Sequence, residues 1–381
     1  METYKNVSCV APFSSLHLAN KSYTCCVINS NRGIDVDPSK DLNWHFENTN
    51  KDYRLEFITA GHNISKYKDC IRCSSRRDGS QNIDHNSKAN LELDYINKPQ
   101  LTNLHIKFSN SCNLACRTCD PGNSSMLFKE NEFFKFQSNK FGKNGLIQKI
   151  DRNSELYKSI LNSLSTLTFV WFSGGEPLLH EEVWEILEIL YEQGYSKNIG
   201  FRVNTNGTIK LTDRRLEILN SFKTLEMHVS MDGFEKIAEY IRTGIVWKIW
   251  WQNLLTYKDS FKSNSIVINI TISVLNIHIL EQLIELFYNN KLKVATNIVF
   301  HPIQLSIINL NQQCKDYINE RYKDGQLDNV LHFLNQPNNL DPIEVIKYID
   351  TRDDYVIKNN IHRNFKSFKE VDPNWHKLLK G

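Results

Sequence analysis

Residues 111–119 read SCNLACRTC, and this stretch decides how the rest of the chain is interpreted. Its three cysteines are Cys112, Cys116 and Cys119, and no fourth metal ligand follows them at helical or knuckle spacing. Three thiolates on one tight loop can hold three irons of a cubane cluster and leave the fourth iron open. The spacing therefore predicts an iron–sulfur cluster with a coordination site for a ligand that is not protein.

A second motif follows an apolar run. Residues 167–172 read LTFVWF, a pattern typical of a buried strand, and residues 173–177, SGGEP, come directly after it. Two adjacent glycines let the backbone approach a ligand closely, and Pro177 suits the first turn of a helix. The two motifs occur in this order, each after a predicted strand, and the pair is more specific than either motif alone.

A zinc site is the alternative interpretation of these cysteines. Cys70 and Cys73 could combine with Cys116 and Cys119 into a four-cysteine zinc knuckle. In such a zinc site Cys112 would lie beside the metal without binding it, so we favour the iron–sulfur cluster over zinc.

The two motifs together resemble those of the radical S-adenosylmethionine (SAM) superfamily. The resemblance implies a [4Fe–4S] cluster whose open iron chelates SAM, and a Gly-Gly-Glu-Pro turn whose Glu176 accepts the SAM amino group. It also implies that Ser230 and Asn206 lie beside the ribose and that Arg242 pairs with the SAM carboxylate. Ordinary turn chemistry for Asn206 and Ser230, and a surface role for Arg242, stay open as alternatives. The implied cofactor-binding residues are Ser173, Gly174, Gly175, Glu176, Asn206, Ser230 and Arg242.

One position departs from the family pattern. The residue before the last cysteine of the motif is usually aromatic and packs near the adenine, whereas this chain has Thr118. We expect other groups to hold the adenine, for example the apolar residues of the predicted strand at 270–274.

Strands and helices alternate through the middle of the chain, which indicates an α/β fold with parallel strands and right-handed crossovers. Six repeats are too few for a closed eight-stranded barrel, so we expect the open, partial (β/α)6 barrel of the radical SAM family over residues 98–302. A C-terminal extension with two or three helices, one of them at 341–350, and no recognisable chemistry is expected at 303–381. The predicted strands are 101–108, 167–172, 199–204, 225–230, 266–274 and 295–300, and the predicted helices are 151–164, 178–193, 213–222 and 279–287. Trp247, Trp250 and Trp251 are expected to pack a helix onto the core.

The N-terminal region carries a second group of cysteines. Residues 9–18 and 22–27 are expected to form a hairpin around a turn at 19–21. Cys9 and Cys25 on this hairpin could join Cys70 and Cys73 around one metal centre, with residues 74–97 as a linker.

This arrangement resembles the SPASM and twitch auxiliary-cluster modules of radical SAM enzymes, although here it would precede the barrel, at residues 1–97. The resemblance implies an auxiliary [4Fe–4S] cluster, and structural zinc stays open because four thiolates suit either metal. The family has a glycine five residues before the second cysteine; Asn20 stands there and tolerates the same positive φ. This spacing and strand alternation select Cys25 over Cys26 as the ligand.

Composition agrees with an intracellular enzyme. The net charge is +3, from 46 basic and 43 acidic residues, so nucleic acid is an unlikely partner. The start of the chain, METYK, is not a signal peptide, and no stretch is long enough to cross a bilayer, so we expect a cytoplasmic location without membrane contact. Cys314 stands apart from the other eight cysteines, and we interpret it as a buried or incidental thiol.

The expected function is radical SAM catalysis: SAM is reductively cleaved to a 5′-deoxyadenosyl radical, which abstracts hydrogen from a peptide or small-molecule substrate. The implied partner is a low-potential electron donor such as flavodoxin or ferredoxin. The alternatives are a non-catalytic iron–sulfur or zinc protein, and a radical SAM enzyme that modifies RNA.

Overall fold

The computed structural model describes residues 11–23, 33–60, 98–135, 145–147, 150–262, 265–322 and 327–381. The chain forms two compact units. The first comprises Met1–Ser109, Gln148–Val203 and Asp213–Glu226, and the second comprises Asn110–Ile147, Asn204–Thr212 and Met227–Gly381. Two of the five boundaries between the units fall within strands, one in β7 (Gly200–Thr205) and one in β8 (Thr224–Ser230).

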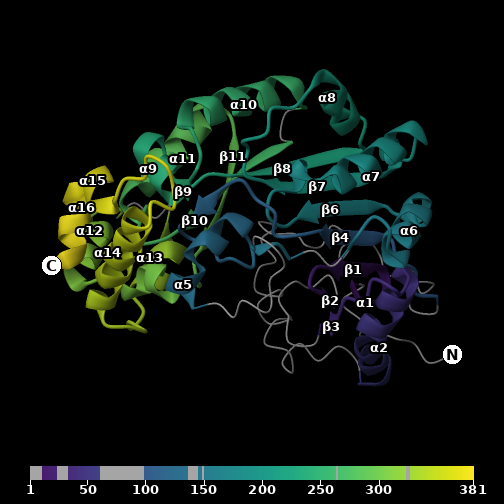
Figure 1. Cartoon of the computed structure of the whole chain (residues 1–381), viewed down its shortest axis with the longest axis horizontal. Coiled ribbons are helices and arrows are strands. Elements are labelled where there is room, and N and C mark those ends of the chain that lie inside the picture. The colour runs from purple at the N-terminus through teal and green to yellow at the C-terminus, as the bar shows by residue number, and fades with distance from the viewer. Residues whose placement is uncertain are drawn as a thin grey trace. The chain divides into compact units, whose positions relative to one another are not determined.

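The first unit is built on a sheet whose strands are ordered β7-β6-β4-β1-β2-β3. Strands β1, β4, β6 and β7 are mutually parallel, and β4, β6 and β7 run side by side in Figure 1. The remaining bounds are β1 (Ser15–Leu18), β2 (Lys21–Tyr23), β3 (Ile34–Asp35), β4 (Asn103–Lys107) and β6 (Phe169–Ser173). The expected parallel strands at 101–108, 167–172 and 199–204 are therefore confirmed.

Alternation of side chains explains how this sheet is covered. Successive residues of a strand point to opposite faces, so Leu104 and Ile106 share one face of β4 while His105 lies on the other. The apolar face continues through Phe172 on β6 and Phe201 on β7, and all four apolar side chains are buried. The opposite face carries polar residues, which are described with the candidate site.

Helices and short 3-10 turns connect these strands. Helix α6 begins after Ser154, whose side chain accepts a hydrogen bond from the Tyr157 N–H, and α7 is followed by Gly194 at φ +71°. Gly194 is the helix stop expected from the sequence. The helices are α1 (Ala11–Ser14), α2 (Leu42–Ala60), α6 (Glu155–Asn162), α7 (Glu181–Glu192) and α8 (Asp213–Asn220), and the 3-10 turns are Leu164–Thr166, Pro177–Leu179 and Ser196–Asn198.

The N-terminal hairpin is confirmed in part. Strands β1 and β2 pair antiparallel around Ala19 and Asn20, but residues 11–14 form the short helix α1 instead of extending the first strand. Asn20 is not among the described residues with positive φ, so the conformational reason for an asparagine there does not hold. Cys9, Cys25, Cys26, Cys70 and Cys73, and the expected linker at 74–97, lie outside the described residues.

The second unit contains the parallel strands β8, β10 and β11, in the order β11-β10-β8, and a two-stranded ribbon of β5 and β9. These strands confirm the expectations at 225–230, 266–274 and 295–300. The bounds are β5 (Ala115–Cys116), β9 (Arg242–Thr243), β10 (Ile266–Ile272) and β11 (Lys293–Ile298), with helices α5 (Asn131–Phe134), α9 (Glu235–Ile241), α10 (Trp247–Ser260) and α11 (Leu280–Asn289), and 3-10 turns Ser125–Glu130, Ile277–Ile279, Ile303–Leu305 and Ile307–Asn309.

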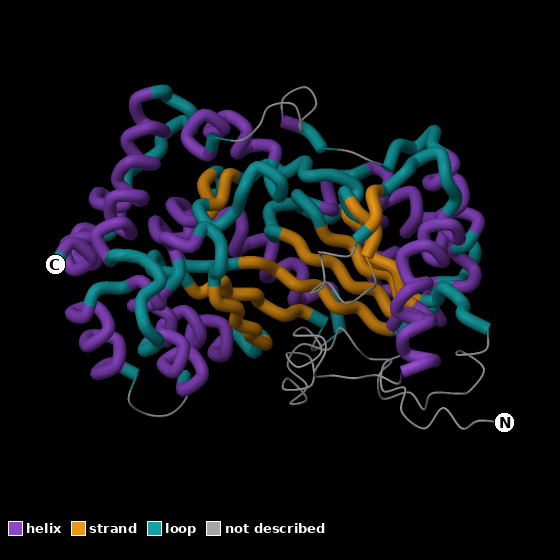
Figure 2. The backbone as a smooth tube through the Cα atoms, turned by 90° about the horizontal axis from the view of Figure 1, so that it is seen from below, coloured by secondary structure: helices purple, strands orange, loops and turns teal. Residues whose placement is uncertain are grey.

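The C-terminal extension holds five described helices rather than two or three, grouped around the C-terminus in Figure 2. The helix expected at 341–350 is α14, which is capped by Asp341 and continues to Lys358. The others are α12 (Gln312–Arg321), α13 (Asp328–Leu334), α15 (Phe368–Val371) and α16 (Pro373–Lys380). The shorter ones escaped prediction because two turns or fewer carry too little periodicity.

The expected packing role of the tryptophans is confirmed at Trp250, which is fully buried on α10. Its indole N–H donates to the backbone carbonyl of Asn206 at 2.9 Å. Across the described ranges, no helix is both long and apolar enough to cross a membrane.

Candidate active site

The cysteine-bearing loop lies in the second unit and is fixed by backbone pairing. Ala115 and Cys116 form β5, which pairs antiparallel with Arg242 and Thr243 of β9. The Arg117 N–H donates to the Ile241 carbonyl at 2.7 Å. The Cys119 N–H donates back to the Cys116 carbonyl at 3.1 Å, which closes the turn between these two cysteines.

Two predicted cofactor-binding residues contact the cysteine sulfurs directly. Asn206 Nδ2 lies 3.8 Å from Cys112 Sγ and 2.8 Å from Asn113 Oδ1. Arg242 Nη1 lies 3.8 Å from Cys116 Sγ. Both side chains therefore place N–H donors against the loop, as expected of groups that stabilise thiolates.

Arg242 is held by a buried carboxylate. Its Nη2 lies 2.9 Å from Asp232 Oδ2, and the other carboxylate oxygen of Asp232 accepts the Thr271 N–H at 2.7 Å. Burial raises the pKa of Asp232, and the Arg242 charge opposes that rise. Arg242 is therefore a buried residue of the loop site, so its predicted surface alternative is wrong.

The donor set suits a cubane cluster. A hydrogen bond with the Cys116 thiol lowers the pKa of Cys119, and the Arg242 charge lowers it further. A thiolate is the form that ligates metal. Within the described ranges no three Cys, His, Asp or Glu side chains converge on a single ion. A cubane does not require that convergence, because each cysteine binds a different iron.

Behind the loop lies a buried network of four charged side chains, Arg117, Glu130, Arg352 and Asp353, which we call the loop clamp. Arg117 Nη2 lies 2.5 Å from Asp353 Oδ1, and Arg352 Nε lies 2.8 Å from Glu130 Oε2. Arg352 Nη1 also donates to the backbone carbonyl of Arg117 at 2.7 Å. All four side chains are at most 2% exposed, and their formal charges cancel.

Three further groups complete the surroundings of the clamp. The Tyr240 hydroxyl donates to Asp353 at 3.1 Å, and the Phe368 N–H donates to the same carboxylate at 2.7 Å. His362 Nε2 lies 2.9 Å from Glu130 Oε1. Burial raises the pKa of Glu130, but the His362 hydrogen bond and the Arg352 and Arg117 charges outweigh it and lower that pKa to about 2.

Sequence reasoning missed the clamp. Arg117 stands between two predicted ligands, yet nothing in the local sequence indicates that its partners come from α14, more than two hundred residues later. The one available signal is the pair of adjacent charged residues Arg352-Asp353 within an otherwise amphipathic helix. Surface helices show the same pattern, so the pair does not indicate a buried network.

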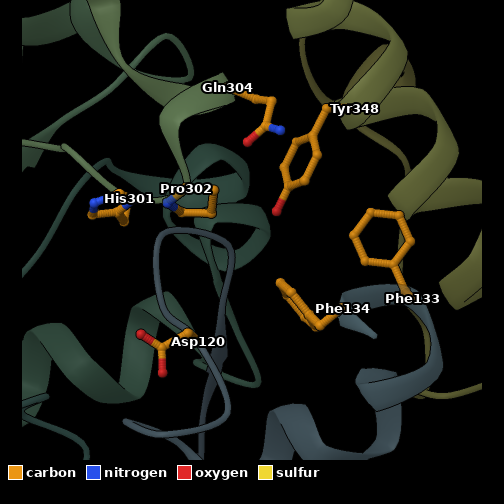
Figure 3. A pocket seen from close by; sticks show the side chains of 7 residues that line it. All are labelled: Asp120, Phe133, Phe134, His301, Pro302, Gln304 and Tyr348. Atoms are coloured by element: carbon orange, nitrogen blue, oxygen red, sulfur yellow. The ribbon is translucent and has the colours of Figure 1, made fainter. Parts of the chain in front are cut away.

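The second unit also has a cavity of about 400 Å³ beside the loop (Figure 3). Asp120, the residue after Cys119, lines it together with Tyr348, which precedes Arg352 by one turn of α14. Aromatic rings and the Gln304 amide form most of its remaining wall. The lining residues are Asp120, Phe133, Phe134, His301, Pro302, Gln304 and Tyr348.

The predicted Gly-Gly-Glu-Pro turn belongs to the first unit. Gly174 adopts φ +132°, and a Cβ there would lie 2.8 Å from the Ser109 carbonyl oxygen, so glycine is required. The Gly175 N–H donates to that same carbonyl at 3.1 Å. Glu176 is fully buried, and its Oε1 accepts the Leu178 N–H at 3.1 Å at the start of a 3-10 turn.

A stacked row of rings crosses the polar face of the first unit's sheet and was also missed. We call His17, His105 and Trp171 the ring row. Their strands place them opposite one another, with ring centroids 3.9 Å apart for the two histidines and 3.8 Å apart for His105 and Trp171. The Arg202 guanidinium caps Trp171 at 5.2 Å and pairs with Glu226.

The histidines of the ring row are neutral. Burial lowers the pKa of His17 to about 3, and the Lys107 charge adds to the effect. Burial also holds the pKa of His105 well below its ordinary value, and its Nε2 lies 2.6 Å from the hydroxyl of Ser173, a predicted cofactor-binding residue. The row therefore buttresses the first residue of the glycine-rich turn.

The predicted residues thus fall into three groups. Cys112, Cys116 and Cys119 lie together with Asn206 and Arg242 in the second unit. Ser230, in the same unit, ends β8 opposite Asn269 of β10. Ser173, Gly174, Gly175 and Glu176 form one turn of the first unit, and the N-terminal cysteines lie outside the described residues.

Residues 106–287 match the model of the radical SAM superfamily, a span just under half of the chain that includes both motifs, Asn206, Ser230 and Arg242. This part of the protein is therefore similar to a radical SAM domain. No curated protein matches the chain.

Solved structures that match the chain include anSMEcpe with bound AdoMet, at 18% identity and a TM-score of 0.43 over 61% of this chain and 62% of that one. SuiB from Streptococcus suis bound to S-adenosylmethionine matches at 15% identity and a TM-score of 0.38, over 81% and 66% of the two chains. The chain thus spans less than two thirds of the length of these structures, and the function proposed below rests on the family match and the geometry.

Proposed function

We propose that this protein is a radical SAM enzyme. The observation that carries the proposal is the loop of Cys112, Cys116 and Cys119 inside the matched domain, with Asn206 and Arg242 donating to two of its sulfurs. A [4Fe–4S] cluster held by these three cysteines would, when reduced, supply the electron for reductive cleavage of SAM, the chemistry that leads to hydrogen abstraction from a substrate carbon.

Residues of the second unit prepare the cluster site. Cys112, Cys116 and Cys119 would hold three irons as thiolates. Arg242 places a positive charge near those thiolates, and Asp232 fixes its orientation. Asn206 holds the first cysteine and the Asn113 side chain together, so the loop is ordered before a cluster binds.

Residues of the glycine-rich turn would bind SAM. The Glu176 carboxylate would accept the SAM ammonium in a charge-assisted hydrogen bond, and Gly174 and Gly175 let the backbone come close to it. We assign Ser230 to the ribose. Arg242 would also pair with the SAM carboxylate. It can do so while it remains paired with Asp232, because a guanidinium carries five N–H donors.

The test is turnover of SAM under anaerobic conditions. Reconstituted protein with dithionite and SAM should release 5′-deoxyadenosine slowly even without substrate, whereas the triple variant with Cys112, Cys116 and Cys119 replaced by Ala should release none. Full zinc occupancy with no visible iron absorption, or a reconstituted wild-type chain that neither binds nor cleaves SAM, would refute the proposal and favour a non-catalytic metal protein.

We further propose that the N-terminal region binds an auxiliary [4Fe–4S] cluster through Cys9, Cys25, Cys70 and Cys73, with module boundaries at 1–97, 98–302 and 303–381. The support is the cysteine spacing and the β1–β2 hairpin that leads toward Cys25. Such a cluster would accept an electron from the substrate radical. A peptide or small molecule is the proposed substrate, and a flavodoxin or ferredoxin the electron donor.

The matched pair Cys25→Ala and Cys26→Ala tests this module. Neighbouring strand residues point to opposite faces, so only one of the two thiols can reach the metal. Cys25→Ala should lose about four irons per chain while the SAM cluster stays, and Cys26→Ala should keep near-normal iron. The reverse pattern would shift the register by one residue, and equal iron in both variants would exclude this hairpin as a source of ligands.

A further inference from the structure

The loop clamp joins the cysteine loop to the C-terminal extension, a region in which the sequence shows no chemistry. Arg352 and Asp353 are neighbours on α14, and each binds Arg117 in a different way. Asp353 pairs with the Arg117 side chain, and Arg352 holds its backbone carbonyl. The peptide between two cysteine ligands is thus fixed at both its side chain and its main chain by one turn of a distant helix.

Two aromatic rings contact the Arg117 side chain. The Tyr240 and Phe365 ring centroids lie 5.3 Å and 5.2 Å from the guanidinium carbon and 5.8 Å from each other, so both rings contact the guanidinium from one side. Asp353 is in turn held by the Tyr240 hydroxyl and the Phe368 N–H. Arg352 is packed over the Phe134 ring at 4.7 Å while it pairs with Glu130.

The clamp carries two positive and two negative charges in a region shielded from water. Interactions between buried charges act through a low effective dielectric and are weakly screened by salt. Arg117 directly follows Cys116 and precedes Cys119 by two residues, so its backbone is part of the loop that carries the thiolates. Glu130 and Asp353 of α14 offset the charge of the Arg117 guanidinium.

We propose that Asp353, Arg352 and Glu130 are positioning residues of the cluster site, which hold the cysteine loop and fix the net charge beside the cluster. The inference rests on the proposed function, since it requires a cluster on Cys112, Cys116 and Cys119. It makes the C-terminal extension part of the redox site. Reduction adds a negative charge to the cluster, so a more positive neighbourhood raises the midpoint potential and a more negative one lowers it.

A set of charge-changing variants tests the sign of this effect. Asp353→Asn and Glu130→Gln each remove a negative charge at constant shape and should shift the midpoint potential of the SAM cluster to more positive values. Arg352→Met removes a positive charge and should shift it to more negative values. Asp354→Asn is the matched control, because Asp354 is the exposed neighbour of Asp353 and should leave the potential unchanged.

The measurements are spectroelectrochemical titration and iron retention, made on full-length reconstituted protein in which the N-terminal cysteines are present in all samples. Loss of a partner that orients a ligand should make iron release to a chelator about 10-fold faster in Asp353→Asn than in Asp354→Asn. Circular dichroism should show that each variant is folded, and if Arg352→Met does not fold, the two acid-to-amide variants still carry the sign test.

The outcomes separate this inference from the proposed function. A wild-type chain without a cluster on the three cysteines would overturn both. A wild-type cluster whose potential is unmoved by Asp353→Asn and Glu130→Gln, or moved in the same direction by Arg352→Met, would overturn the charge-setting role alone. Equal iron release from Asp353→Asn and Asp354→Asn would overturn the holding role.

Discussion

The ring row of the first unit and the loop clamp of the second bury polar side chains in opposite ways. In the ring row, His17 and His105 are held neutral and stack face to face. In the clamp, charges are kept and paired at hydrogen-bond distance, as between Arg117 and Asp353. A neutral ring behind Ser173 puts no net charge near the glycine-rich turn, whereas the clamp puts a balanced set of charges beside the cysteine loop.

The difference teaches which assembly is sensitive to the loss of one member. Removing one partner of a buried ion pair leaves an uncompensated charge, which is far more costly than removing a neutral side chain of similar shape. Replacing one ring of a neutral stack removes mainly packing contacts and any hydrogen bond that this ring makes. The clamp should therefore behave as a unit and the ring row as a set of replaceable pieces.

Paired substitutions would break this contrast most directly. Asp353→Asn should lower the free energy of unfolding by about 3–5 kcal/mol, because it leaves Arg117 buried without its carboxylate. His17→Phe keeps a flat ring on the same face and should cost less than about 1.5 kcal/mol. Urea unfolding of both variants measures the difference, and equal losses would mean that charge pairing does not distinguish the two assemblies.

Only local features of the two units could be predicted from the sequence. Apolar alternation located β4, β6 and β7, because each strand carries its own period-two signal, and cysteine spacing located the loop. Arg242 was reached through resemblance, but its partner Asp232 was not, since Asp-Gly is an ordinary turn pair.

The ring row and the clamp depend on pairing that no local pattern encodes. His17 meets His105 because β1 pairs in parallel with β4, and that register cannot be read before the topology is known. Asp353 meets Arg117 across more than two hundred residues of chain. The short helix α1 was missed for a different reason: four residues between β-forming neighbours give propensity too little weight.

Glu176 is the buried carboxylate of the glycine-rich turn in the first unit. Its replacement tests the proposed SAM contact of that turn. Glu176→Ala should weaken SAM binding by about 1.5–3 kcal/mol, because the SAM ammonium loses a charge-assisted acceptor. Isothermal titration with SAM on the reconstituted protein measures the change. The exposed Glu181 supplies the control variant Glu181→Ala, and an unchanged affinity in Glu176→Ala would remove this residue from the SAM site.

The stability contributed by the ring row and that contributed by the loop clamp are lost at different pH values. His17 has its pKa lowered from 6.5 to about 3, so below pH 6.5 the unfolded chain binds a proton that the folded chain does not. Its contribution to stability is therefore complete above pH 6.5 and declines as the pH falls toward 3, by about 1.4 kcal/mol per pH unit. Glu130, lowered from 4.5 to about 2, adds stability that is lost only below pH 4.5.

The window between pH 6.5 and 4.5 therefore isolates the neutral histidines from that part of the clamp. Urea unfolding at intervals across the window should show a shallower loss of stability in His17→Phe than in wild type, because the variant has no imidazole to protonate on unfolding. Glu130→Gln should change the absolute stability but leave the slope in this window as it is in wild type. A His17→Phe slope equal to that of wild type would mean that His17 is already protonated in the folded protein, and the ring row would then be a charged assembly like the clamp.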